Sequence, residues 1–133
     1  MDVQLNYLAL FVAALSTFLI GGFWYSPAAF GKVWMRENGF TEESLKGGNM
    51  IKIFGLAFLL GLISAVNLAM FMGPEKNPAM GALWGFLAGA GWVATFVGTH
   101  YLFERKSFTL FMINAGYSIV ALTIMGTILA AWH

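Results

Sequence analysis

The sequence predicts an all-α, polytopic membrane protein, a four-transmembrane-helix bundle with a short interfacial amphipathic helix in its first connection. Of the 133 residues, 59% are hydrophobic and 10% are charged, whereas a soluble domain has about 45–50% and about 25%. Seven Lys+Arg and six Asp+Glu are too few to cover a globule of this size. The charges also lie outside four long apolar segments, each near the roughly 20 residues that a membrane-spanning helix needs. This composition excludes a water-soluble enzyme.

Each of the four segments is 19 to 25 residues long and contains no Asp, Glu, Lys or Arg. They are residues 5–23, 53–72, 80–103 and 108–132. The first lacks a positively charged n-region and a small-residue cleavage site, so we expect it to be retained as a helix. The second and third connections are short, which requires antiparallel neighbours, and we expect residues 1–133 to form a single domain.

Lys and Arg residues are distributed unequally between the two sides of this bundle. The first connection holds four of them and the third holds two, whereas the second holds only Lys76. Cytoplasmic connections carry an excess of Lys and Arg. We therefore expect the first and third connections to lie in the cytoplasm and both termini to lie outside.

The first connection carries helix signals of its own. Ser26 and Pro27 favour a helix start, apolar side chains follow at helical spacing, and Gly39 favours a helix end. We expect an amphipathic helix over residues 27–38, lying in the membrane interface. A second short helical turn is expected over residues 41–46.

Each predicted span carries small residues at four-residue spacing, which lets helices pack closely in a bilayer. The stripes are Ala9, Ala13, Thr17 and Gly21; Ala57, Gly61, Ala65 and Ala69; Gly81, Gly85 and Gly89; and Thr123, Thr127 and Ala131. The same stripes suit a tight bundle or the interface of a homo-oligomer, and the sequence leaves this choice open.

No acidic or basic residue lies in the middle of a span, which argues against ion-coupled transport. Polar side chains gather instead near the predicted cytoplasmic ends of the last two spans, and aromatic residues of the first connection could cover them. The predicted ligand-binding pocket consists of His100, Asn114, Tyr117, Trp24, Tyr25 and Ser26. The alternative is that these polar groups only hold the helices together by hydrogen bonds.

Other chemistry finds little support in the sequence. There is no Cys, and His100 and His133 are expected on opposite membrane faces, so we expect no metal and no cofactor. A net charge of +1 and few basic residues do not suit a nucleic-acid surface. The expected partners are the lipid bilayer, a small apolar ligand and further copies of the chain in a homo-oligomer.

Three motifs resemble a family of bacterial membrane proteins, the domain-of-unknown-function 1761 family. They are Trp24-Tyr25-Ser26-Pro27 with Phe30-Gly31-Lys32 and Trp34, then Tyr101-Leu102-Phe103-Glu104-Arg105-Lys106, and Ile113-Asn114-Ala115-Gly116-Tyr117. The similarity covers nearly the whole chain. The resemblance implies a four-helix membrane protein and assigns no established activity. We expect the chain to lie in the bacterial cytoplasmic (inner) membrane.

The favoured function is the binding or transport of a small apolar or amphipathic ligand near the cytoplasmic leaflet. One alternative is a membrane enzyme that uses His100 as acid or base on a lipid-soluble substrate. Another is a structural or partner-binding membrane subunit. The lack of any recognisable catalytic constellation favours a protein that is not an enzyme.

Overall fold

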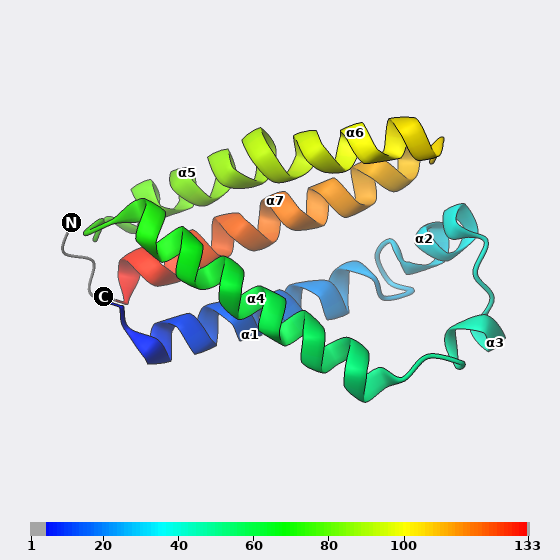
Figure 1. Cartoon of the computed structure of the whole chain (residues 1–133), viewed down its shortest axis with the longest axis horizontal. Helices are drawn as coiled ribbons and strands as arrows, with labels where there is room; N and C mark the ends of the chain where they lie inside the picture. Colours follow the sequence, from blue (N-terminus) through cyan, green and yellow to red (C-terminus); the bar gives the residue numbers. More distant parts are fainter. Residues whose placement is uncertain (1–4, 133) are drawn as a thin grey trace.

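A computed structural model describes residues 5–132, and over this range it is all-helical (Figure 1). Four helical segments are long and apolar enough to cross a membrane, as predicted. They are α1 (Tyr7–Trp24), α4 (Met50–Met72), the continuous segment Pro78–Glu104, and α7 (Phe108–Ala131). Two short helices, α2 (Gly31–Asn38) and α3 (Glu42–Leu45), lie in the first connection.

A polar side chain caps the start of each long helical segment. The side-chain oxygens of Asn6, Asn49, Asn77 and Ser107 each accept a hydrogen bond from a backbone N–H in the first turn. Such caps satisfy amide groups that have no partner within the helix. The cap at Asn49 explains why α4 begins at Met50, three residues before the predicted start of that span.

The third predicted span is confirmed as one continuous helical segment, Pro78–Glu104, but its middle is not a regular α-helix. It consists of α5 (Pro78–Ala88), a π-helical segment η1 (Gly89–Val93), and α6 (Ala94–Glu104). A π segment inserts one residue into the helical repeat. Each residue of a regular helix turns by about 100°, so the side chains of α6 point about 100° away from the directions that an unbroken helix would give them.

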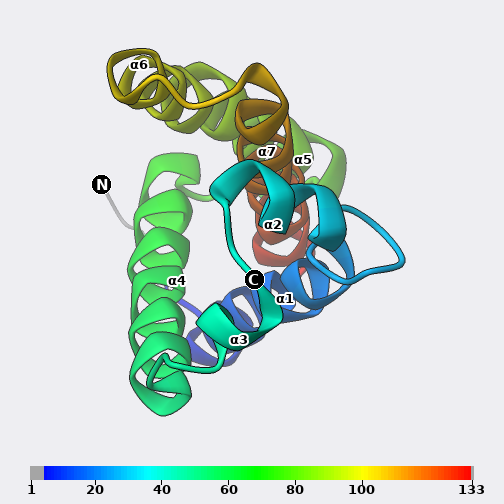
Figure 2. The same cartoon turned by 90° about the vertical axis from the view of Figure 1, so that its right-hand side faces the viewer.

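Helix α7 is the centre of the bundle (Figure 2). It packs against α5 on one side and α1 on the other, whereas α4 packs mainly against α1. Aromatic rings join α4 to α1, with Phe58 at 5.4 Å from Phe11 and 6.0 Å from Phe18. The buried core residues are Ala9, Leu10, Ala13, Ala65, Leu68, Met72, Met125, Leu129 and Ala130.

The closest helix contact is the antiparallel pair α5 and α7. A Cβ atom added to Gly81 would collide with the carbonyl oxygen of Gly126, and one added to Gly85 with that of Leu122. The predicted glycine stripe of the third span therefore forms this interface. Of the stripe predicted for the fourth span, Thr123 lies in this contact, since its Cα would be 2.9 Å from a Cβ on Gly85. The stripe is wrong at its end, where Gly126 and Ala130 are buried and Ala131 is exposed.

The first connection folds back onto the bundle, and its helix α2 packs against α7. Helix α2 begins at Gly31 rather than at residue 27, because the preceding residues form turns in which Ser26 O accepts from the N–H groups of Ala29 and Gly31. Its predicted end is confirmed, since Gly39 adopts a left-handed φ of 72°. The second short turn is α3, capped by Thr41 as expected.

The first and third connections lie at the same end of the bundle (Figure 1). This end carries six of the seven basic residues, four from the first connection and two from the α6–α7 turn. We call it the basic end. The α4–α5 turn, with Lys76, lies at the opposite end.

Candidate functional site

A chain of hydrogen bonds at the basic end joins three elements through one amide. The hydroxyl of Tyr25, just after α1, donates to Oδ1 of Asn114 in α7 at 2.6 Å. Nδ2 of Asn114 donates to the hydroxyl oxygen of Tyr101 in α6, also at 2.6 Å. Asn114 therefore fixes the end of α1 and the end of α6 to the central helix.

Aromatic side chains surround this chain. The ring of Tyr117 lies 5.5 Å from that of Tyr25, and its hydroxyl donates to the carbonyl oxygen of Thr17 at 3.1 Å. On its other side Tyr25 meets Trp34 of α2, with ring centroids 5.6 Å apart. We call Tyr25, Tyr101, Asn114 and Tyr117 the tyrosine–asparagine cluster.

Trp24 anchors the first connection a little further out. Its indole N–H donates to the carbonyl oxygen of Ile113 at 2.8 Å, and its ring lies 4.9 Å from that of Phe30. Gly116 leaves room for this ring, since an added Cβ would lie 3.0 Å from Trp24 Cζ2. Trp24 and Tyr25, at the end of α1, thus both contact residues 113–117 of α7.

The structure brings together three of the six predicted site residues, Tyr25, Asn114 and Tyr117, with Trp24 beside them. The hydroxyl of Ser26 donates to the carbonyl oxygen of Phe23 in its own turn. His100 is exposed, and its side chain makes no hydrogen bond or ion pair within residues 5–132, so it is not linked to Asn114. The assignment of these six residues to a ligand-binding pocket stays a prediction.

Sequence reasoning missed Tyr101 as a site residue and named it as part of a motif shared with the family. Tyr101 lies 13 residues before Asn114, and a tight turn joins their two helices, so both side chains lie at a similar depth in the bundle. The amide of Asn114 and the hydroxyl of Tyr101 could therefore have been predicted to form a hydrogen bond. The choice between Tyr101 and His100 depends on the rotation that η1 introduces, and the spacing of apolar residues does not reveal this rotation.

A cavity of about 340 Å³ adjoins the cluster, between the last turns of α6 and the first turns of α7. We call it the α6–α7 cavity. Its lining residues are Gly98, Tyr101, Leu102, Lys106, Ser107, Phe108 and Phe111. Lys106 Nζ lies 5.9 Å from the centre of the Tyr101 ring. Leu102 and Phe108 are 81% and 73% exposed, so the cavity has exposed apolar side chains at its mouth.

The model of the family described as "Protein of unknown function (DUF1761)" matches residues 8–130, nearly the whole chain. The chain belongs to the DUF1761 family. The match includes all four long helices except the terminal residues Tyr7 and Ala131, and it includes the tyrosine–asparagine cluster and the α6–α7 cavity. No curated protein matches the chain, and no solved structure matches it.

In this DUF1761 member the groups of the hydrogen-bond chain, two tyrosine hydroxyls and one amide, are all uncharged near neutral pH. Burial raises the pKa of the Tyr25 hydroxyl, and the neighbouring Tyr117 and Tyr101 raise it further. Tyr25 therefore stays protonated near neutral pH and can donate to Asn114. Within residues 5–132 no group of three or more His, Cys, Asp or Glu side chains could hold a metal ion.

Proposed function

We propose that this protein binds a small amphipathic ligand with an anionic head group, seated in the α6–α7 cavity near the cytoplasmic leaflet. The observation that carries the proposal is the composition of this cavity. It combines an apolar wall with one ammonium group, Lys106, at the basic end of a bundle apolar enough to cross a membrane.

The size and lining of the α6–α7 cavity support this proposal. Small-molecule sites are usually concave, mostly apolar, and about 300–1,000 Å³ in volume, with a few polar groups that orient the ligand. The apolar part of a ligand would pack against Leu102, Phe108 and Phe111. Its anionic group would pair with Lys106, which makes no ion pair within the described part of the chain.

Tyr101 gives a second observation in support of the proposal, because it belongs to both the cavity and the cluster. Its ring lines the cavity, while its hydroxyl oxygen accepts from Asn114. A wall that is fixed by a hydrogen bond is preorganised, which lowers the entropy lost on binding. The cluster would then act as the support of the site rather than as the site itself.

The proposal is tested with oleate as the probe and its uncharged methyl ester as the control ligand, on protein in phosphatidylcholine nanodiscs. Oleate is expected to raise the thermal unfolding midpoint more than the ester does. Lys106→Met should weaken oleate binding about tenfold, because the ion pair at the cavity is lost. Lys46→Met removes an exposed charge at the same end and should leave binding unchanged.

A second variant fills the cavity without changing a charge. A Cβ on Gly98 would lie 3.0 Å from Phe111 Cε2, so Gly98→Leu is expected to displace the apolar part of the ligand. Helical circular dichroism and elution volume show whether this variant folds. Oleate binding that is unchanged in both Lys106→Met and folded Gly98→Leu would contradict the proposal.

We also propose that the chain lies in the bacterial cytoplasmic membrane with its basic end in the cytoplasm, as the distribution of Lys and Arg favours. The absence of Cys allows single-cysteine variants without background labelling. In intact cells a membrane-impermeant maleimide should label Pro74→Cys and not Gly47→Cys, whereas both should react after permeabilisation. The reverse pattern would show that the basic end faces outward.

The enzyme alternative gains nothing from the geometry, because His100 is exposed and the cluster residues bond to one another. The partner-binding alternative and the homo-oligomer stay predictions. Blue native electrophoresis of the oleate-binding preparation distinguishes a single chain from an oligomer.

A further inference from the structure

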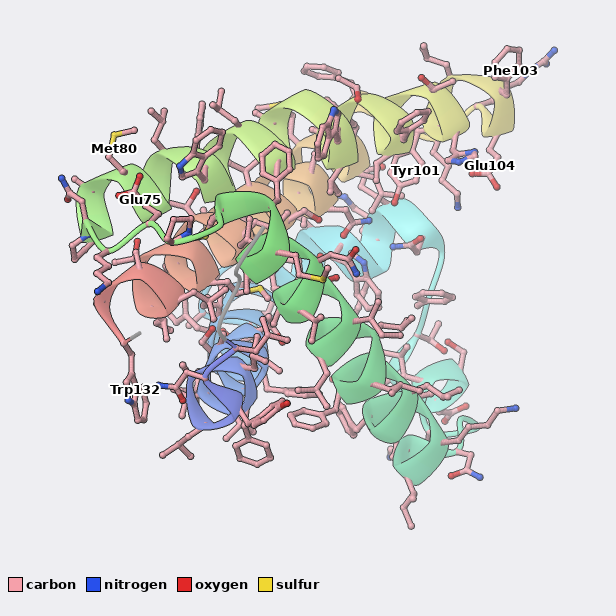
Figure 3. All side chains as sticks on the ribbon, turned by 60° about the vertical axis from the view of Figure 1, so that its left-hand side comes forward. Glu75, Met80, Tyr101, Phe103, Glu104 and Trp132 are labelled. Atoms are coloured by element: carbon pink, nitrogen blue, oxygen red, sulfur yellow. The ribbon has the colours of Figure 1, made fainter. Side chains whose placement is uncertain are left out.

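A cavity of about 430 Å³ lies at the end of the bundle opposite the basic end. There the start of α1 meets the ends of α4 and α7 and the α4–α5 turn. We call it the turn cavity. It is lined by residues of all four of these segments, among them Ala69, Glu75 and Lys76. Figure 3 shows Glu75 and Trp132 at this end and Tyr101 at the other.

The first observation is where the charges of this end lie. Within residues 5–132 every other charged side chain belongs to the basic end, so Glu75 and Lys76 are the only two here. Both line the turn cavity. They form no ion pair with each other within this range, although Glu75 Oε2 accepts the backbone N–H of Asn77 at 3.2 Å. Neither charge is thus neutralised by another charged side chain of the described range.

The second observation is the apolar floor below these charges. Ala9, Leu10, Met72 and Leu129 line the cavity and belong to the buried core, so the cavity reaches into the space between three helix ends. Uncharged polar groups complete the rim. Asn6 Nδ2 contacts the carbonyl oxygen of Trp132 at 3.5 Å.

We infer that the turn cavity binds a small zwitterion, a molecule that carries one ammonium group, one anionic group and an apolar part. The ammonium group would pair with Glu75 and the anionic group with Lys76, while the apolar part would occupy the floor. This ligand class differs from that of the α6–α7 cavity, and the inference does not depend on the proposed function.

A ligand with a single charge fits this cavity less well. An amine would pair with Glu75 but would also lie close to the ammonium of Lys76. An anion would pair with Lys76 but would lie close to the carboxylate of Glu75. Like charges that are brought together at a partly desolvated site oppose binding. A zwitterion leaves neither side chain unpaired.

The same chemistry has two sources, the head group of a zwitterionic phospholipid and a free amphipathic zwitterion from solution. The probes are therefore dioleoylphosphatidylethanolamine, its anionic counterpart dioleoylphosphatidylglycerol, and free L-leucine. Binding of the lipids is measured by native mass spectrometry of the detergent-solubilised full chain. Binding of leucine is measured by isothermal titration. Preference for the ethanolamine lipid over the glycerol lipid identifies the lipid source, and saturable leucine binding identifies the free source.

Four variants test the assignment of the charges. Glu75→Gln and Lys76→Met should each weaken binding of the preferred zwitterion about tenfold, the effect of losing one ion pair. The matched changes Glu43→Gln and Lys46→Met, exposed and at the basic end, should leave it within about twofold.

A fifth variant, Ala69→Phe, fills the cavity while both charges remain, and in folded protein it should also reduce binding. Equal binding of the two lipids together with no leucine binding would overturn the inference. So would zwitterion binding that Glu75→Gln and Lys76→Met change no more than the two matched controls do.

Discussion

Gly85→Ala is expected to destabilise the fold by about 1–3 kcal/mol, the usual cost of forcing extra volume into a close-packed interface. The new methyl group would collide with the carbonyl oxygen of Leu122 and would lie 2.6 Å from its carbonyl carbon. Both atoms belong to the backbone of α7, so no side chain can move aside. The helices α5 and α7 would have to move apart where their backbones lie closest together.

Gly55→Ala is the matched control for this prediction. Gly55 lies within α4, and an added Cβ meets nothing within 4 Å. In a helix interior Ala is favoured over Gly by about 1 kcal/mol, so this variant should be neutral or slightly stabilising. Thermal unfolding in detergent micelles, followed by circular dichroism, compares the two. An unfolding midpoint for Gly85→Ala as high as that for Gly55→Ala would mean that α5 and α7 do not approach so closely.

Asn114→Leu is expected to release the first connection from the bundle. The variant removes the partner of Tyr25 and the donor to Tyr101 in one step. Hydrogen bonds between membrane helices contribute about 0.6 kcal/mol each, so the loss of two costs about 1 kcal/mol. Leaving the two part-buried hydroxyls without a partner adds up to about 1 kcal/mol. The expected loss of stability is therefore about 1–2 kcal/mol, concentrated at the junction of α1, α2 and α7.

Trypsin reports this release directly, because Lys32, Arg36 and Lys46 lie in the connection. Cleavage there should become several times faster in Asn114→Leu. Asn67→Leu is the control, since within residues 5–132 Nδ2 of Asn67 bonds only the carbonyl oxygen of Ile63 in its own helix. Tyr25→Phe and Tyr101→Phe should each show part of the effect. Equal cleavage rates in the Asn114 and Asn67 variants would show that the cluster does not hold the connection.

Much of the fold could be predicted from the sequence, because its determinants are local. The apolar segments define the four spans, and their small residues predict close packing. Gly39 and Thr41 act through the conformation and hydrogen bonds of their own turns. The start of α2 could not be predicted in this way. Its position depends on backbone hydrogen bonds within the turn after α1, which compete with the helix start that Ser26 and Pro27 favour.

The partners within the site were harder to predict, and η1 explains part of this. In an unbroken third helix, residue 100 would face Asn114. The π segment adds one residue before this point, so residue 101 faces Asn114 instead, and Tyr101 accepts its hydrogen bond. The glycines around Gly89 do not by themselves distinguish a π segment from a regular helix. The two cavities are also invisible in the sequence, because each volume depends on how far several helix ends lie apart.

The most direct test of the central claim is where a photoactivatable fatty acid attaches to the protein. With a carboxylate head group and a diazirine in its chain, the probe should label Leu102, Phe108 and Phe111 in preference to other exposed apolar residues. The label should be lost with excess oleate and strongly reduced in Lys106→Met. Labelling spread evenly over α1, α4, α5 and α7, unaffected by oleate or by Lys106→Met, would contradict binding of an anionic amphiphile in the α6–α7 cavity.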